Sequence, residues 1–309
     1  RSGDQDSGIT SYTEYSQTHP YIGMPIKSQR SLNGVILNET TATLAAISLG
    51  GTRYFPYVAR SVEQSFETNG AFVSSTTTDK TYDNFGNPTQ IVVSSHDGYV
   101  KTTTSTYDND VNNWILGRLR TAQVRSALPD GTSAVRTSSF AYNQTTGAIT
   151  QEVIEPGTAY ALTTDYAYDS FGNKVSVTVS GPDIVTRTTT TTYDAQGRFP
   201  IKTTNALGHT ETRAFDPRFG TVTSLTGPNG LTTSWTYDSF GRKTSETRAD
   251  GTKTTWTLAW CDSSCPQWGK YYSAVTNSGA PTTWAFYDSL NREIRQQTQG
   301  FDGGLIAKD

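Results

Sequence analysis

Residues 236–252, TYDSFGRKTSETRADGT, contain two reverse-turn signals separated by one short β-type segment. The first is Tyr237-Asp238 followed by a glycine turn, and the second is Asp250-Gly251. An Asp-Gly pair between strand-like runs predicts a type I′ turn, in which both central residues have positive φ. The residues between the turns are rich in threonine, whose β-branched side chain suits a pleated strand. The stretch therefore predicts a unit of strand, tight turn, strand and Tyr-Asp turn.

The Tyr-Asp phrase recurs along the chain. Its aromatic positions lie roughly 22 to 35 residues apart, except for one longer gap, which is the spacing of stacked supersecondary repeats. A second glycine turn lies between most successive phrases, as at Asp97-Gly98 and Asn229-Gly230. We therefore predict a repeat protein in which the following residues are structural: Tyr82, Asp83, Gly86, Tyr107, Asp108, Tyr142, Tyr168, Asp169, Gly172, Tyr193, Asp194, Gly197, Phe215, Asp216, Tyr237, Asp238, Gly241, Tyr287 and Asp288.

The composition predicts an all-β fold with little core. Threonine accounts for 53 of the 309 residues, and hydrophobic residues for only 34%. In residues 187–192, RTTTTT, neither face of the expected strand is apolar, unlike a strand that covers a thick core. We expect a thin sheet of antiparallel hairpins in sequence order, with both of its faces exposed to solvent. Residues 41–48 come nearest to a short helix.

The candidates for chemistry are few. His19, His96 and His209 are isolated, and the chain lacks the HExxH and GxSxG motifs of metalloproteases and hydrolases. The aspartates after tyrosine lack the dense oxygen ligands of a calcium loop, whereas an aspartate side chain readily accepts backbone N–H bonds in a turn. We expect no enzyme activity, no cofactor and no metal. The net charge of −3 argues against nucleic acid, and no apolar run is long enough to span a membrane.

The two cysteines, Cys261 and Cys265, lie in the segment CDSSCP. The spacing fits half of a zinc site, but no second pair or neighbouring histidine completes four ligands. We interpret the pair as a disulfide that pins a loop, which oxidising surroundings would permit. Free thiols are the alternative.

The phrases TYDNFGNPTQ, AYDSFGNKVS and TYDSFGRKTSETRADGT resemble the tyrosine-aspartate repeats of the RHS family. The segments PYIGMPIKSQRSLNG and GGTRYFPYVARSVEQSFETNG resemble the lead-in to these repeats in SpvB-like and toxin-complex proteins. The resemblance implies a spiral of β-hairpins that forms part of a hollow shell around a toxic C-terminal polypeptide. It also implies lead-in strands in residues 1–80 and repeats in residues 81–309, truncated within the last unit. The self-cleaving aspartyl site of the family has no match, and Asp216 belongs to an ordinary repeat turn.

Two functions follow from this reading. The first is a non-catalytic segment of a secreted or cell-surface bacterial shell, with an enclosed toxin polypeptide and neighbouring repeats as partners. The second is an extracellular module that binds a carbohydrate or another partner, because exposed aromatic rings stack on sugars. The residues concerned are Trp235, Trp256, Trp268, Tyr271, Tyr272 and Trp284. For a fragment of a shell we also expect self-association, because unpaired strand edges and apolar residues such as Leu305 and Ile306 would be uncovered.

Overall fold

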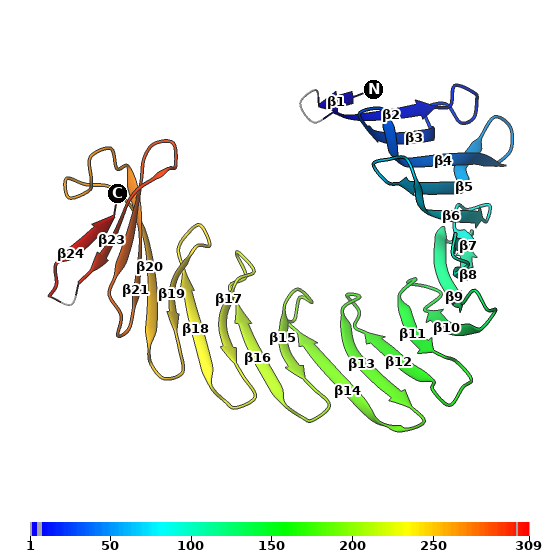
Figure 1. Cartoon of the computed structure of the whole chain (residues 1–309). Coiled ribbons are helices and arrows are strands. Elements are labelled where there is room, and N and C mark those ends of the chain that lie inside the picture. The colour runs from blue at the N-terminus through cyan, green and yellow to red at the C-terminus, as the bar shows by residue number, and fades with distance from the viewer. Residues whose placement is uncertain (1, 5–7, 301, 309) are drawn as a thin grey trace. The chain divides into compact units, whose positions relative to one another are not determined.

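The computed structural model describes residues 2–4, 8–300 and 302–308. Within these residues all regular elements are β-strands, joined by turns, which confirms the all-β prediction (Figure 1). The chain folds as two compact units. The first contains the residues up to Tyr166 together with Val179–Thr186, and the second contains Ala167–Thr178 together with the residues from Arg187 onward.

The strands of the first unit pair in chain order, each antiparallel to the next. They are β1 (Ser2–Asp4), β2 (Ile9–Tyr15), β3 (Pro25–Leu32), β4 (Val35–Ser48), β5 (Tyr54–Phe66), β6 (Phe72–Tyr82), β7 (Pro88–Ser95), β8 (Val100–Asp110), β9 (Ile115–Ala127), β10 (Ser133–Tyr142) and β11 (Ile149–Ile154). Three further strands contribute residues to both units: β12 (Leu162–Tyr168), β13 (Lys174–Gly181) and β14 (Ile184–Tyr193).

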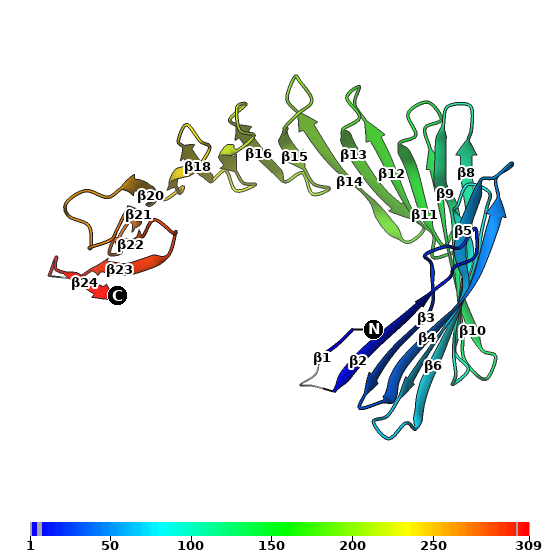
Figure 2. The same cartoon turned by 90° about the horizontal axis from the view of Figure 1, so that it is seen from above.

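The second unit continues the same antiparallel pairing from β14 onward (Figure 1 and Figure 2). Its other strands are β15 (Pro200–Thr204), β16 (Thr210–Phe215), β17 (Val222–Thr226), β18 (Thr232–Tyr237), β19 (Lys243–Thr247), β20 (Lys253–Trp260), β21 (Tyr271–Asn277), β22 (Thr283–Tyr287), β23 (Glu293–Gln299) and β24 (Leu305–Lys308). The predicted succession of antiparallel hairpins in sequence order is confirmed.

Residues 41–48, which come nearest to a helix in the sequence, belong to strand β4 instead. Thr41 pairs with Lys27 of β3 on one side and with Val62 of β5 on the other. Residues 42–48 pair with β5 alone, so this antiparallel partner supplies the backbone hydrogen bonds that a helix would make within itself. Strand pairing overrides the local apolar spacing.

The Asp-Gly turns do not have the predicted type I′ geometry. In the turn after β7, Gly98 has a φ of 91°, while Asp97 keeps a negative φ. The Gly98 N–H donates to the Ser95 carbonyl at 3.1 Å, and the Ser95 N–H donates to the Tyr99 carbonyl at 2.9 Å. This is a three-residue loop, a type I turn followed by a left-handed glycine. The reason is steric, since only the residue without a Cβ takes the left-handed position.

Little of the molecule is buried. Ala274 and Phe286 are the buried apolar residues among those that the structure describes, and no large side chain there is completely buried. Threonine hydroxyls instead bond across neighbouring strands, as between Thr106 and Thr121 at 2.6 Å. Pairwise contacts along and between hairpins therefore replace a central core as the source of order.

Candidate functional site

The Tyr-Asp phrases lie where strands end. The aromatic residue closes its strand at Tyr82 (β6), Tyr142 (β10), Tyr168 (β12), Tyr193 (β14), Phe215 (β16), Tyr237 (β18) and Tyr287 (β22). A β-bulge lies directly before Tyr82, Tyr107, Tyr142, Tyr193, Phe215, Tyr237 and Tyr287. A bulge adds one residue to one strand and bends it, so it re-aims the ring at the strand end.

Several of these tyrosines link one repeat to the preceding one. The Tyr237 hydroxyl donates to the carbonyl oxygen of Val222 at 2.7 Å, and Val222 is the residue that pairs with the previous aromatic, Phe215. The same rule holds for two other copies: Tyr107 donates to Pro88, the partner of Tyr82, at 3.1 Å, and Tyr142 donates to Leu119, the partner of Tyr107, at 2.9 Å. The phenol therefore holds successive hairpins in register.

The aspartate of the phrase organises the turn. Oδ1 of Asp238 accepts the N–H groups of Phe240 at 2.9 Å and Arg242 at 3.0 Å, and Oδ2 accepts from the Arg242 Nε at 2.6 Å. In Asp83 the same two backbone bonds form, and the side-chain donor is the amide of Asn87 at 2.9 Å. The carboxylate thus satisfies turn N–H groups that no strand can reach.

These contacts favour the ionised carboxylates. Hydrogen bonds from the Arg218 guanidinium, together with the Arg218 N–H, lower the pKa of Asp216 to about 2. At Asp288 the Arg292 N–H and then its side chain hold the pKa below its ordinary value. At Asp238 desolvation acts to raise the pKa, but the bonds from Arg242 outweigh it, so the pKa is again lowered. The turns therefore carry anions bonded within the repeat.

The phrase TYDND differs from the others. Asp108 lies inside β8, which continues to Asp110, and Asp110 Oδ1 accepts the turn N–H groups of Asn112 and Asn113 at 3.1 Å each. Asp108 instead binds the buried Arg118 at 2.6 Å. The reason is local, because no glycine follows Asp108 at the third position and the turn forms two residues later.

Aromatic rings cover the turn glycines of neighbouring repeats. A Cβ on Gly241 would lie 3.0 Å from Cγ of Phe219, and one on Gly220 would lie 3.3 Å from Phe199. Gly197 lies against Phe171 in the same way. These glycines have positive φ values of 76°, 69° and 67°, so they serve both turn geometry and close approach. We call this succession the ring-on-glycine ladder, with Phe171, Phe199 and Phe219 as its rings.

The ladder ends at Phe240, where the longer gap between Tyr-Asp phrases begins. After the glycine turn between β19 and β20, the next connection is the loop of residues 261–270, which takes the place of a Tyr-Asp turn. A recess of 450 Å³ lies at this position, lined by Phe240, Arg242, Leu258, Trp260 and Tyr271. The side chains of Phe240 and Trp260 are 77% and 82% exposed.

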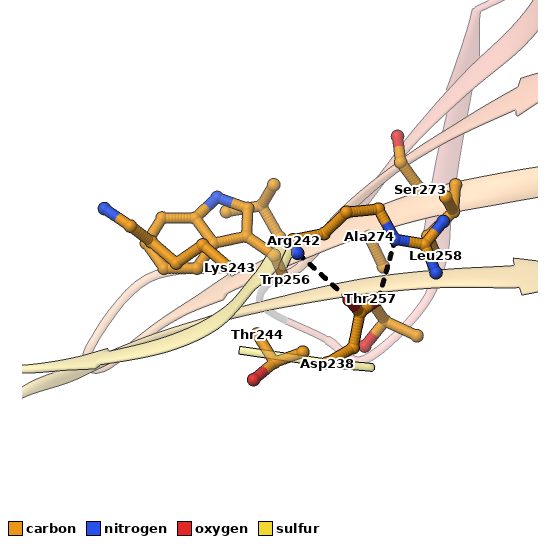
Figure 3. A pocket seen from close by; sticks show the side chains of 10 residues that line it. Asp238, Arg242, Lys243, Thr244, Trp256, Thr257, Leu258, Ser273 and Ala274 are labelled. Carbon is orange, nitrogen blue, oxygen red and sulfur yellow. Dashed lines mark hydrogen bonds and ion pairs between the residues drawn. The ribbon is translucent and has the colours of Figure 1, made fainter. Parts of the chain in front are cut away.

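A second recess of 510 Å³ adjoins the first and shares Arg242 and Leu258 with it (Figure 3). Trp256 and Lys243 lie side by side at one end, with the Lys243 ammonium 5.3 Å from the indole centroid. Trp256, Leu258 and Trp260 alternate along β20 and so share one face of the sheet. We call the two recesses together the aromatic groove, defined by Phe240, Arg242, Trp256, Leu258, Trp260 and Tyr271.

The aromatic residues singled out in the sequence do not all meet. Trp256 and Tyr271 line the groove, and Trp235 donates its Nε1–H to Glu246 at 2.8 Å while its ring contacts Lys243. Tyr272 and Trp284 lie on the opposite face, where Tyr272 contacts the ring of Phe286.

Sequence reasoning missed two aromatic residues of the groove, Phe240 and Trp260, as well as Arg242 and Leu258. The signal for Phe240 was its place beside Gly241 in a Tyr-Asp turn. For Trp260 it was the spacing of Trp256, Leu258 and Trp260, because residues two apart in a strand point to the same face.

The loop of residues 261–270 is closed covalently. Cys261 and Cys265 are joined in a disulfide with a Cα–Cα distance of 5.6 Å. The Cys261 N–H donates to the Lys270 carbonyl at 2.9 Å, and Trp268 is 74% exposed in this loop. The disulfide and the backbone bond fix the segment that replaces a Tyr-Asp turn beside the groove.

The histidines take part in ring contacts and turns. His19 contacts Tyr54 and His96 contacts Phe72, each edge to face at 5.4 Å between centroids, and the His209 N–H donates to Asn205 at 3.0 Å. Within the described part of the chain, no group of three or more histidine, cysteine, aspartate or glutamate side chains is placed to hold a metal. The same residues contain no helix that could cross a membrane.

The comparisons with known proteins agree with this geometry. The family model described as RHS Repeat matches residues 215–253, which contain the Phe215 and Tyr237 phrases, the turns that follow them and the Asp250-Gly251 turn. This match and the recurring Tyr-Asp turns support a resemblance to RHS-repeat proteins. No curated protein matches its sequence.

Solved structures share the fold of this chain. The crystal structure of TcdB2-TccC3 aligns with 99% of the chain at a TM-score of 0.63 and 12% identity. The crystal structure of TcdB2-TccC3-Cdc42 aligns with 93% of the chain at a TM-score of 0.66 and 11% identity. Both likenesses concern the fold, and this chain spans 24% of the length of each of those chains.

Proposed function

We propose that this chain is a non-catalytic wall segment of a secreted bacterial shell built of RHS repeats, which encloses a toxin polypeptide. The repeat links carry the proposal. Each tyrosine hydroxyl bond, such as that from Tyr237 to Val222, ties one hairpin to the preceding one through a backbone carbonyl. Such a layer can extend by adding repeats, because each repeat needs contact only with its neighbours.

The thinness of the layer supports the same role. Few apolar side chains are buried in the described residues, so the sheet does not close on a core of its own. The fold is that of the TcdB2-TccC3 crystal structure, and the chain corresponds to about a quarter of that longer chain. The enclosing function therefore belongs to a longer protein of which the chain forms one part of the wall. The disulfide between Cys261 and Cys265 is compatible with an oxidising compartment outside the cytosol.

Photocross-linking from the two faces of one strand tests this proposal. Thr189 and Thr190 are adjacent exposed residues of β14, so their side chains point to opposite faces. In the full-length gene product, a benzoylphenylalanine at one of these positions should cross-link to the C-terminal polypeptide, and the same group at the other should not. Each position is the matched control for the other. Cross-links to that polypeptide from neither position, or equally from both, would contradict an enclosing wall.

A further inference from the structure

The aromatic groove is where the ring-on-glycine ladder lacks its next member. The ring of Phe219 packs on Gly241 and is 41% exposed, whereas the ring of Phe240, one repeat later, borders an open recess and is 77% exposed. Trp260 faces the same recess and is 82% exposed. Large apolar rings that remain open beside a preformed recess favour a flat group that can stack on them.

The charges around the groove are paired. The Arg242 guanidinium is bound to Asp238 at 2.6 Å, and the Lys243 ammonium lies 3.8 Å from Glu246 while it contacts the indole rings. Glu246 is also bound to Arg248 at 3.1 Å. Three cations therefore share two carboxylates, and each of these charged side chains already has an ion-pair partner, so none is left free to bind an ionic ligand. A neutral ligand fits it best.

The polar groups lie between the rings. Arg242 extends along the recess toward Leu258, and Ser273 lies beside it at the opposite wall (Figure 3). The terminal N–H groups of Arg242, whose Nε–H is held by Asp238, and the hydroxyl of Ser273 can bond to ligand hydroxyls, while the rings of Trp256 and Trp260 meet apolar C–H groups. The two recesses, of 510 and 450 Å³, fall within the size of small-molecule sites.

From these observations we infer that the aromatic groove binds a neutral oligosaccharide. Sugar rings lie against Phe240, Trp256 and Trp260, and their hydroxyls bond to Arg242 and Ser273. The pyranose ring suits this arrangement because it has an apolar C–H face and a rim of uncharged hydroxyls. A charged side chain of a polypeptide would find the charged groups of the groove already engaged in ion pairs. The inference does not rest on the proposed shell function, since cargo cross-linking and sugar binding are separate measurements.

Titration of the purified chain, followed by tryptophan fluorescence and calorimetry, tests the inference. The probes are cellohexaose, chitohexaose, maltohexaose and xylohexaose, with hexagalacturonate as an anionic comparison and reduced, carboxymethylated lactalbumin as an unfolded polypeptide. We expect at least one neutral oligosaccharide to bind with a Kd of about 1 mM or tighter. The Trp260→Ala and Phe240→Ala variants should each weaken this binding by roughly tenfold or more.

Trp268→Ala is the matched control, because Trp268 is 74% exposed but does not line either recess. Its binding should stay within about twofold of the parent, a change below about 0.5 kcal/mol. All three replaced side chains are exposed, so the folds should be kept, which far-UV circular dichroism checks. Absence of binding by every neutral probe, equal loss in Trp268→Ala, or binding of only the anion or only the polypeptide would each overturn the inference.

Discussion

Alanine at Gly241 should destabilise the protein more than alanine at Gly172, although both glycines close a Tyr-Asp turn. Their φ values are 76° and 84°, so a Cβ at either position costs about 1–2 kcal/mol through left-handed backbone strain. At Gly172 a Cβ would meet nothing within 4 Å. At Gly241 it would lie 3.0 Å from Cγ and 3.1 Å from Cδ1 of Phe219, which adds about 1–3 kcal/mol of overpacking.

We therefore expect a loss of about 1–2 kcal/mol in the free energy of unfolding for Gly172→Ala and about 2–5 kcal/mol for Gly241→Ala. Urea unfolding of the purified chain, followed by circular dichroism and fluorescence, gives both values from the transition midpoints. A double-mutant cycle isolates the contact with the ring. In a Phe219→Ala background the Cβ at position 241 meets no ring, so Gly241→Ala should cost only the backbone strain.

Equal losses at the two glycines would refute the ring-on-glycine ladder, as would a Gly241→Ala loss that is the same with and without Phe219. A small loss at both positions would instead contradict the left-handed geometry of the turns. Thr189→Ser, an exposed strand substitution, should stay within about 0.5 kcal/mol and serves as the reference for changes that touch neither feature.

Two further predictions concern the tyrosine links between repeats and the aspartates of the turns. Tyr237→Phe removes the hydroxyl that bonds to Val222 and should cost about 1 kcal/mol in urea unfolding, whereas Tyr160→Phe, at an 85% exposed ring, should cost close to nothing; equal effects would contradict the link. The turn aspartates should make the fold sensitive to acid. Since the pKa of Asp216 is lowered to about 2, its contribution is fully present above the ordinary pKa near 3.8 and is lost as the pH falls from about 4 to 2. The urea concentration at the unfolding midpoint should therefore be lower at pH 2.5 than at pH 5. The decrease should be smaller in Asp216→Asn, which keeps an oxygen acceptor without the charge. An unchanged midpoint at the two pH values would argue against the role of the carboxylates.

The positions of the turns, and the residues that form them, could largely be predicted from the sequence. Asparagine, aspartate and glycine mark places where the chain reverses, and these are contacts between residues two to five apart. Asn291 illustrates the rule, because it takes a φ of 62° at the position that glycine occupies in TYDSFGR. The turn type was harder to predict, since type I′ and the observed three-residue loop use the same Asp-Gly pair and differ in the sign of φ at the aspartate and in where the strand pairing resumes.

The sequence by itself determined that the chain is built of antiparallel hairpins, that glycine turns punctuate them and that no thick core forms, because local propensity and alternation decide these properties. It also determined which side chains share a strand face, such as those of Trp256 and Trp260. Only the tertiary structure decided which repeat meets which. The contact of Phe219 with Gly241, the bond from Tyr237 to Val222 and the open end of the ladder at Phe240 depend on distances between residues some 15 to 22 positions apart. Those distances are set by bulges and by the stacking of hairpins, which no local pattern specifies.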